Sequence, residues 1–130
     1  MSGSACAKFQ TARECGTFVE AIKSWKNQAP PAASGPVTSP AAASIDALAL
    51  AARYDDLVVR IDALHLTSSE LKPRAQRYQK LAREAAKSLR DVAAAVEKGD
   101  SAGARQRRVQ FDDIARGEAP LVADINGVCR

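Results

Sequence analysis

The sequence predicts an all-α protein: an up-down-up-down four-helix bundle with a Pro/Ala-rich linker between its first and second helices. Apolar residues recur every three or four positions over most of the 130 residues, and no segment alternates with the period of two that a β-strand requires. The predicted turns at 65–67 and 98–100 are short, which favours antiparallel neighbours. We expect a single domain over 1–130, because a chain of this length has room for one modest core.

The first predicted helix spans 6–28 and is followed by the linker. Its apolar face steps by three, four and three residues, through Cys15, Phe18, Ile22 and Trp25. Residues 29–39 are rich in Pro, Ala and Ser and carry no charge, so we expect a semi-extended internal linker. Trp25 borders this linker and is expected in the core, with an anchor for a partner as the alternative.

The second predicted helix spans 40–64. Ser39 offers an N-cap hydroxyl, and Pro40 suits the first helical position. The apolar face alternates by four and three residues through Leu50, Tyr54, Leu57, Ile61 and Leu64. Four aspartates fall largely off that face, which predicts an acidic exterior: Asp46, Asp55, Asp56 and Asp62.

The segment LTSSEL predicts the start of a third helix. Thr67 and Glu70 have the spacing of a capping box, and Leu66 and Leu71 have that of a hydrophobic staple. Pro73 follows closely, so the helix is expected either to kink at this proline or to begin there.

Gly99 predicts the end of the third helix, and Asp100 predicts the N-cap of a fourth helix over 101–128. Gly117 and Pro120 predict a kink or short break within this fourth helix. The apolar face of the third helix keeps a 3–4 alternation through Ala75, Tyr78, Ala82, Ala85, Leu89, Val92 and Val96.

The cysteines predict a disulfide between Cys15 and Cys129. In an up-down-up-down bundle the first and last helices share a pole, and both cysteines are in phase with the apolar faces of their helices. Closing a loop of this size stabilises a fold by up to ~4–5 kcal/mol in the chain-entropy model. The alternative is three reduced cysteines in a cytosolic protein. Cys6 is out of phase with Cys15 and is expected to stay unpaired, although it could compete for Cys129 or, less plausibly, carry a lipid.

A disulfide implies export, to the periplasm or the cell surface. The first residues, MSGSAC, lack the charged and apolar segments of a signal peptide. We interpret them as a mature start from which an export signal was removed. No run of 18 apolar residues is present, so no membrane span is expected, although a lipid anchor in the precursor stays open.

The sequence shows no catalytic or metal-binding pattern. His65 is the only histidine, and we interpret it as a turn residue rather than a metal or haem ligand. The pairs Asp55–Asp56 and Asp112–Asp113 diverge by about 100° on a helix, so neither forms a carboxylate dyad. There is no CxxC motif and no Gly-rich phosphate loop. We therefore expect a protein that is not an enzyme and that binds no cofactor or metal.

A basic stripe on the third helix is the one feature that suggests binding. The net charge is +4, which permits anionic partners without requiring them. No aromatic side chain is interleaved for base stacking, so we favour a solvated helix face over a nucleic-acid or lipid footprint. The stripe, which we call the basic face, consists of Arg77, Lys80, Arg83, Lys87 and Arg90; Arg74, Arg105, Arg107 and Arg108 add charge nearby.

Three segments carry a resemblance: ECGTFVEAI, LKPRAQRYQKLAREAAKSLRDVAAAVEKGD and EAPLVADINGVC. Their layout resembles small all-helical exported bacterial proteins and lipoproteins of unassigned function. The resemblance implies a cell-envelope setting and carries over no catalytic residue. We expect a non-catalytic, exported module that is structural or binds a protein partner. The alternatives are a nucleic-acid- or anionic-surface-binding protein using the basic face, and a carrier of a small apolar ligand held between Ala-rich helix seams.

Overall fold

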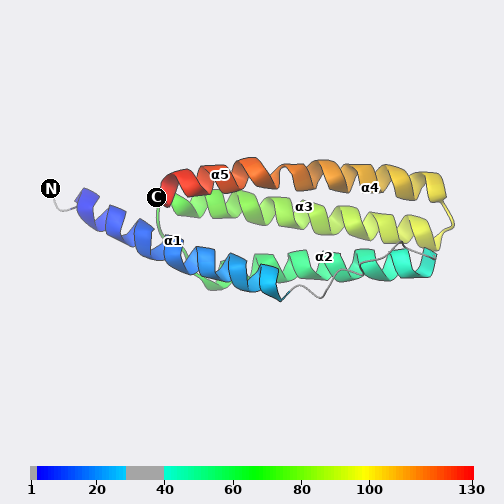
Figure 1. The fold of residues 1–130 in the computed structure, drawn as a ribbon, viewed down its shortest axis with the longest axis horizontal. Coiled ribbons are helices and arrows are strands. Elements are labelled where there is room, and N and C mark those ends of the chain that lie inside the picture. Colours follow the sequence, from blue (N-terminus) through cyan, green and yellow to red (C-terminus); the bar gives the residue numbers. More distant parts are fainter. Residues whose placement is uncertain (1–2, 29–39) are drawn as a thin grey trace.

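The computed structural model describes residues 3–28 and 40–130, with side chains from Cys6 and from Ala43 onward. All regular structure in these residues is helical: α1 (Gly3–Asn27), α2 (Pro40–Ala63), α3 (Leu71–Glu97), α4 (Ser101–Arg116) and α5 (Glu118–Val128). Neighbouring long helices run antiparallel, and α4 and α5 share one direction (Figure 1). The predicted bundle is thereby confirmed. The linker at 29–39, including the predicted cap Ser39, lies outside the described residues.

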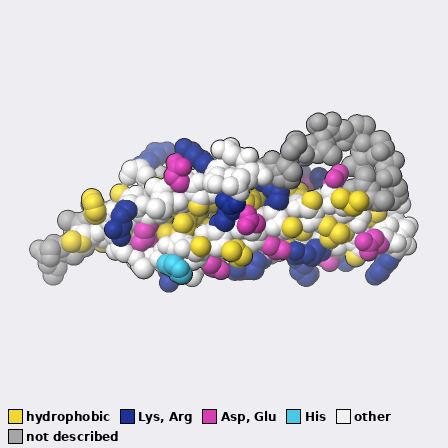
Figure 2. All heavy atoms as spheres, turned by 90° about the horizontal axis from the view of Figure 1, so that it is seen from below, with side chains coloured by type: hydrophobic (Ala, Val, Ile, Leu, Met, Phe, Trp, Pro, Cys, Tyr) yellow, Lys and Arg dark blue, Asp and Glu magenta, His cyan; other side chains and the backbone are white. Residues whose placement is uncertain are grey.

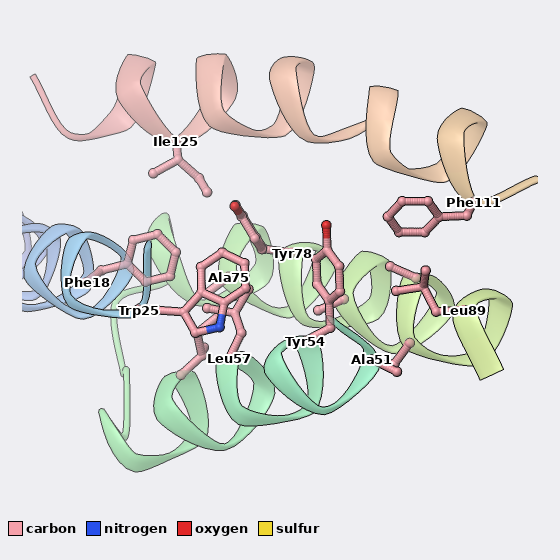
Figure 3. Close-up of a cluster of buried hydrophobic side chains, with 14 of the residues drawn as sticks. Phe18, Trp25, Ala51, Tyr54, Leu57, Ala75, Tyr78, Leu89, Phe111 and Ile125 are labelled. Atoms are coloured by element: carbon pink, nitrogen blue, oxygen red, sulfur yellow. The ribbon is translucent and has the colours of Figure 1, made fainter. Parts of the chain in front are cut away.

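Helix α3 is the centre of the packing, because it contacts α1, α2, α4 and α5. The largest fully buried side chains include Tyr78, Leu57 and Leu89, and Figure 3 shows them between the helices. Small side chains allow these helices to approach closely. The buried alanines are Ala47, Ala51, Ala75, Ala82, Ala85, Ala86 and Ala93, which confirms the Ala-rich seams.

The predicted helix boundaries at Gly99, Asp100 and Gly117 are confirmed. Gly99 has a φ of 72° and its N–H donates to the carbonyl of Val96 at 3.0 Å, as at the αL position of a Schellman motif. Asp100 Oδ1 accepts from the amide of Gly103 at 2.8 Å, which caps α4. Gly117 separates α4 from α5, so the fourth helix is broken there.

The capping box predicted for Thr67 and Glu70 is wrong. Helix α3 begins at Leu71, and Glu70 makes no side-chain cap hydrogen bond. Ser68 takes the capping role, since its Oγ accepts from the amide of Leu71 at 3.1 Å. Thr67 bonds instead to Glu14 of α1. The carboxylate of Glu14, on another helix, accepts from the Thr67 amide in place of the Glu70 carboxylate.

The alternative in which α3 begins at Pro73 is also wrong. Pro73 is the third residue of α3, which starts at Leu71. Amides of the first helical turn have no intrahelical acceptor, so the missing N–H of a proline costs little there. His65, at the preceding turn, is exposed and has a φ of 49°.

Helix α1 is shifted along the bundle relative to the sequence prediction. The shared pole of the predicted bundle puts the start of α1 beside the end of the last helix, yet α1 begins at Gly3 and Cys15 lies near its middle. The N-terminal turns therefore project past the other helices (Figure 1). Phe9, on this projection, is 74% exposed, whereas Phe18 and Trp25 are buried.

Candidate functional site

The structure contains the predicted disulfide between Cys15 and Cys129. The two Cα atoms are 5.6 Å apart and the sequence separation is 114 residues. Cys15 is buried, and Cys129 packs against the same core. Cys6 is free and exposed, as predicted. The bond connects the first helix, α1, to the end of the last helix, α5.

Glu14 makes a second attachment of α1, which we call the Glu14 clamp. Its Oε1 accepts from the backbone amides of Thr67 at 2.8 Å and Ser68 at 2.9 Å. Its Oε2 accepts from Thr67 Oγ1 at 2.9 Å and from Gln10 at 3.3 Å. Desolvation raises the pKa of Glu14, but the hydrogen bonds from Ser68 and Thr67 together hold it below the usual range. The role of Glu14 could not be seen in the sequence, because Thr67 and Ser68 are more than 50 positions away.

The substitution Glu14→Gln is expected to lower the free energy of unfolding at neutral pH by on the order of 1 kcal/mol. The reason is that the hydrogen bonds from Thr67 and Ser68 lose the negative charge of their acceptor. A lowered folded-state pKa contributes stability above the unfolded value, which is 4.5 for this carboxyl. That stability is lost as the pH falls through the folded pKa. The difference between wild type and variant should therefore shrink below about pH 4.5, as urea titrations at stepped pH would measure. A difference that persists unchanged at low pH would contradict the clamp, and Glu20→Gln, exposed on α1, is the control.

A polar cluster joins α1, α3 and α5, and it runs from the buried Tyr78 to the exposed Lys26. The hydroxyl of Tyr78 donates to Glu118 Oε1, and Lys26 Nζ lies 3.7 Å from the same oxygen. Burial, followed by the hydrogen bond to Glu118, raises the pKa of the Tyr78 phenol far above its ordinary value. Tyr78 was expected only as a core residue; a tyrosine in an apolar seam signals that a polar partner is needed, but the sequence does not identify that partner.

Trp25 is part of the core. Its indole Nε1 donates to the carbonyl of Arg53 at 2.7 Å, and the Arg53 guanidinium lies 4.8 Å from the ring centroid. The guanidinium also donates back to the carbonyl of Trp25 at 3.3 Å. Since Trp25 is only 7% exposed, its side chain anchors α1 to α2 within the core.

The basic face lies on the solvent side of α3, where the sequence placed it. Its five side chains are all exposed, namely Arg77, Lys80, Arg83, Lys87 and Arg90. Three of them have acidic neighbours: Arg77 lies 3.2 Å from Asp124 of α5, Lys87 lies 3.9 Å from Asp91, and Arg90 pairs with Asp55 of α2.

Lys80 and Arg83 have no ion-pair partner among the described residues. Lys80 and Glu84 have the i,i+4 spacing of a helical ion pair, but they form none in the same part of the chain. The structure therefore brings aspartates of α2 and α5 to the edges of the basic face and leaves two cations at its centre. Because of these aspartates, the basic face attracts polyanions less strongly than its number of basic residues suggests.

The other residues considered as metal ligands or acid–base groups, His65 and the aspartate pairs, do not form a common site among the described residues. Within residues 3–28 and 40–130, no group of three or more His, Cys, Asp or Glu side chains is arranged to hold a metal ion. Asp56 pairs with Arg60 at 2.7 Å, and Asp113 pairs with Arg116 at 2.9 Å. These carboxylates belong to surface ion pairs, and they form no acid–base pair.

Several grooves mark the described part of the bundle surface, and the following two are open to solvent. One, of about 570 Å³, runs between α1 and α2 and is lined by Gly16, Thr17, Glu20, Ala21, Ser24, Arg60, Ala63 and Leu64. The other, of about 370 Å³, lies between α3 and α4 and includes Lys87, Asp91, Arg107 and Asp113. Small side chains dominate the first groove, and both grooves carry acidic and basic residues.

None of the described helices is both long enough and apolar enough to cross a membrane. A comparison with protein-family models, with curated proteins and with solved structures gives no match to this chain.

Proposed function

We propose that this protein is an exported, non-catalytic helical module that acts in the cell envelope through contacts with protein. The observation that carries the proposal is the Cys15–Cys129 disulfide, because such bonds persist in oxidising compartments and are rare in the cytosol. The bond also stabilises the position of α1, whose N-terminal turns project beyond the bundle.

The geometry gives less support to the alternative functions. Binding of nucleic acid or anionic lipid through the basic face is opposed by Asp55 and Asp124, which pair with Arg90 and Arg77. Carriage of a small apolar ligand requires an enclosed, mostly apolar pocket, whereas the two grooves described above are open.

Thiol labelling in intact source cells tests the export. A membrane-impermeant maleimide is added before lysis, and the protein is then isolated and weighed by mass spectrometry without reductant. We expect a single added label at Cys6, which is exposed, with Cys15 and Cys129 unlabelled until reduction. An acyl group on Cys6 in place of the label would equally place the protein in the envelope. Three thiols that react only after lysis would refute the proposal.

A further inference from the structure

A hollow of about 200 Å³ lies at the turn between α2 and α3. Its lining comes from the last turn of α2, from the connecting turn and from the first turns of α3. Ile61, Leu66 and Ala75 are buried and form its apolar part, and its other lining residues are polar or charged. Figure 2 looks onto the bundle from the α2 side and shows charged side chains of both signs next to the histidine. An apolar lining with a few polar groups is typical of a binding site for a small molecule.

Gln79 lines this hollow and has an amide oxygen without a partner. The residue is 5% exposed, and its Nε2 donates to the carbonyl of Val58 at 3.0 Å and to Asp62 Oδ1 at 2.7 Å. Both partners are acceptors, which fixes the orientation of the amide and turns Oε1 away from them. Among the described residues no hydrogen bond reaches Oε1. Because buried amide oxygens are normally hydrogen-bonded, we expect Oε1 to accept from a group outside these residues.

Two opposite charges line the same hollow without pairing. Asp62 of α2 and Lys72 of α3 both contribute to it, and both are exposed. In the described part of the chain neither forms an ion pair, with the other or with any third residue. The side chain of Asp62 bonds only to the neutral amide of Gln79 there. A carboxylate and an ammonium group that share a hollow but do not meet are complementary to a ligand carrying both charges.

His65 lines the hollow from a backbone conformation that favours glycine. Its φ is 49°, and its N–H donates to the carbonyl of Asp62 at 3.2 Å. It follows the end of α2, where a residue with positive φ is usually glycine. Histidine is less stable than glycine in this conformation, so the presence of an imidazole here indicates a role for the side chain.

We propose that this hollow, which we call the turn pocket, binds a small zwitterion of the free α-amino acid class. The ammonium group of the ligand donates to Asp62 and to Gln79 Oε1, and its carboxylate accepts from Lys72, with the imidazole of His65 as a second donor. A short aliphatic side chain fits the apolar part of the lining, since the volume is below the ~300–1,000 Å³ of pockets for larger ligands. Because Asp62 and Lys72 are exposed, water screens both contacts, and we expect a dissociation constant in the millimolar range. The proposal is independent of export and of the basic face.

An NMR titration of the full, isotope-labelled chain with L-valine tests the proposal. We expect saturable shifts of the backbone amides that line the turn pocket and of the Gln79 side-chain amide, complete by ~50 mM ligand, as for millimolar binding. Asp62→Asn and Lys72→Gln should each weaken the affinity about ten-fold or more, since each removes a charged partner of the ligand. Asparagine still offers an oxygen acceptor to Gln79, so that hydrogen bond can be kept.

Matched controls come from the same two helices. Asp46→Asn on α2 and Lys80→Gln on α3 change exposed residues outside the turn pocket and should leave the affinity for L-valine unchanged. Two analogues separate the charges of the ligand: N-acetyl-L-valine lacks the ammonium group, and L-valinamide lacks the carboxylate. Each analogue should bind about ten-fold or more weakly than L-valine.

His65→Gly gives a second readout that separates binding from folding. Glycine suits the backbone conformation of this position, so the variant should bind L-valine more weakly without a lower midpoint in urea. The absence of saturable shifts at the turn pocket with L-valine would overturn the proposal. So would an affinity for either analogue equal to that for L-valine, because the hollow would then recognise a single charge.

Discussion

Loss of the Cys15–Cys129 disulfide is expected to lower the free energy of unfolding by about 4–5 kcal/mol. The bond joins residues 114 positions apart, so the cross-linked unfolded chain has lost far more conformational freedom than the reduced one. A small domain is stabilised by roughly 5–15 kcal/mol in total. The effect is therefore a large share of the stability of the fold.

Urea denaturation of oxidised wild type, of reduced wild type and of Cys15→Ala/Cys129→Ala measures this effect. The reduced protein and the double variant should agree closely, because both lack the bond and alanine keeps the Cβ atom of each cysteine. Cys6→Ser is the control and should match wild type, since Cys6 is exposed and unpaired. Equal midpoints with and without reductant would show that the bond does not stabilise the bundle.

Tyr78→Ala is expected to destabilise the protein by about 3–5 kcal/mol, the cost of removing a buried aromatic ring. Tyr78 is 1% exposed, and its ring packs edge-on against Phe18 of α1 with centroids 6.4 Å apart. Its hydroxyl donates to Glu118 at the start of α5. One side chain thus connects three helices, and its removal leaves both a cavity and a carboxylate without its donor (Figure 3).

Two further variants separate the ring from the hydroxyl. Tyr78→Phe keeps the ring and should cost about 1 kcal/mol, the net value of one hydrogen bond. Phe9→Ala removes an aromatic ring that is 74% exposed and should change stability by less than about 0.5 kcal/mol. Thermal and urea unfolding followed by circular dichroism measures all three. A Tyr78→Phe variant as unstable as Tyr78→Ala would mean that the hydroxyl, and not the packing, dominates.

The local features of the fold were predictable because their causes lie within a few residues of chain. The 3–4 spacing of apolar residues predicts each helix and its buried face. Gly99 ends α3 through its own backbone conformation, and Asp100 caps α4 through an amide three residues away. The exposure of the basic face follows from the same periodicity, since those residues lie opposite the seam of α3.

Residues that act across the bundle were not predictable from such patterns. Glu14 replaced Glu70 as the partner of the Thr67 amide, although a local capping box was available in the sequence. The acidic partners of the basic face, Asp55 and Asp124, come from other helices. Periodicity tells which side of a helix is buried, but it does not tell how far one helix is shifted along another.

The sequence by itself determined the helices, their order and the pairing of Cys15 with Cys129, because phase within each helix and antiparallel order were enough for these. Only the tertiary structure decided the axial position of α1, which makes the Glu14 clamp and leaves the first turns of the helix projecting. It likewise decided which face of α2 the other described helices leave exposed. The physical reason is that axial shift and lateral coverage depend on side-chain packing between segments that are remote in the chain.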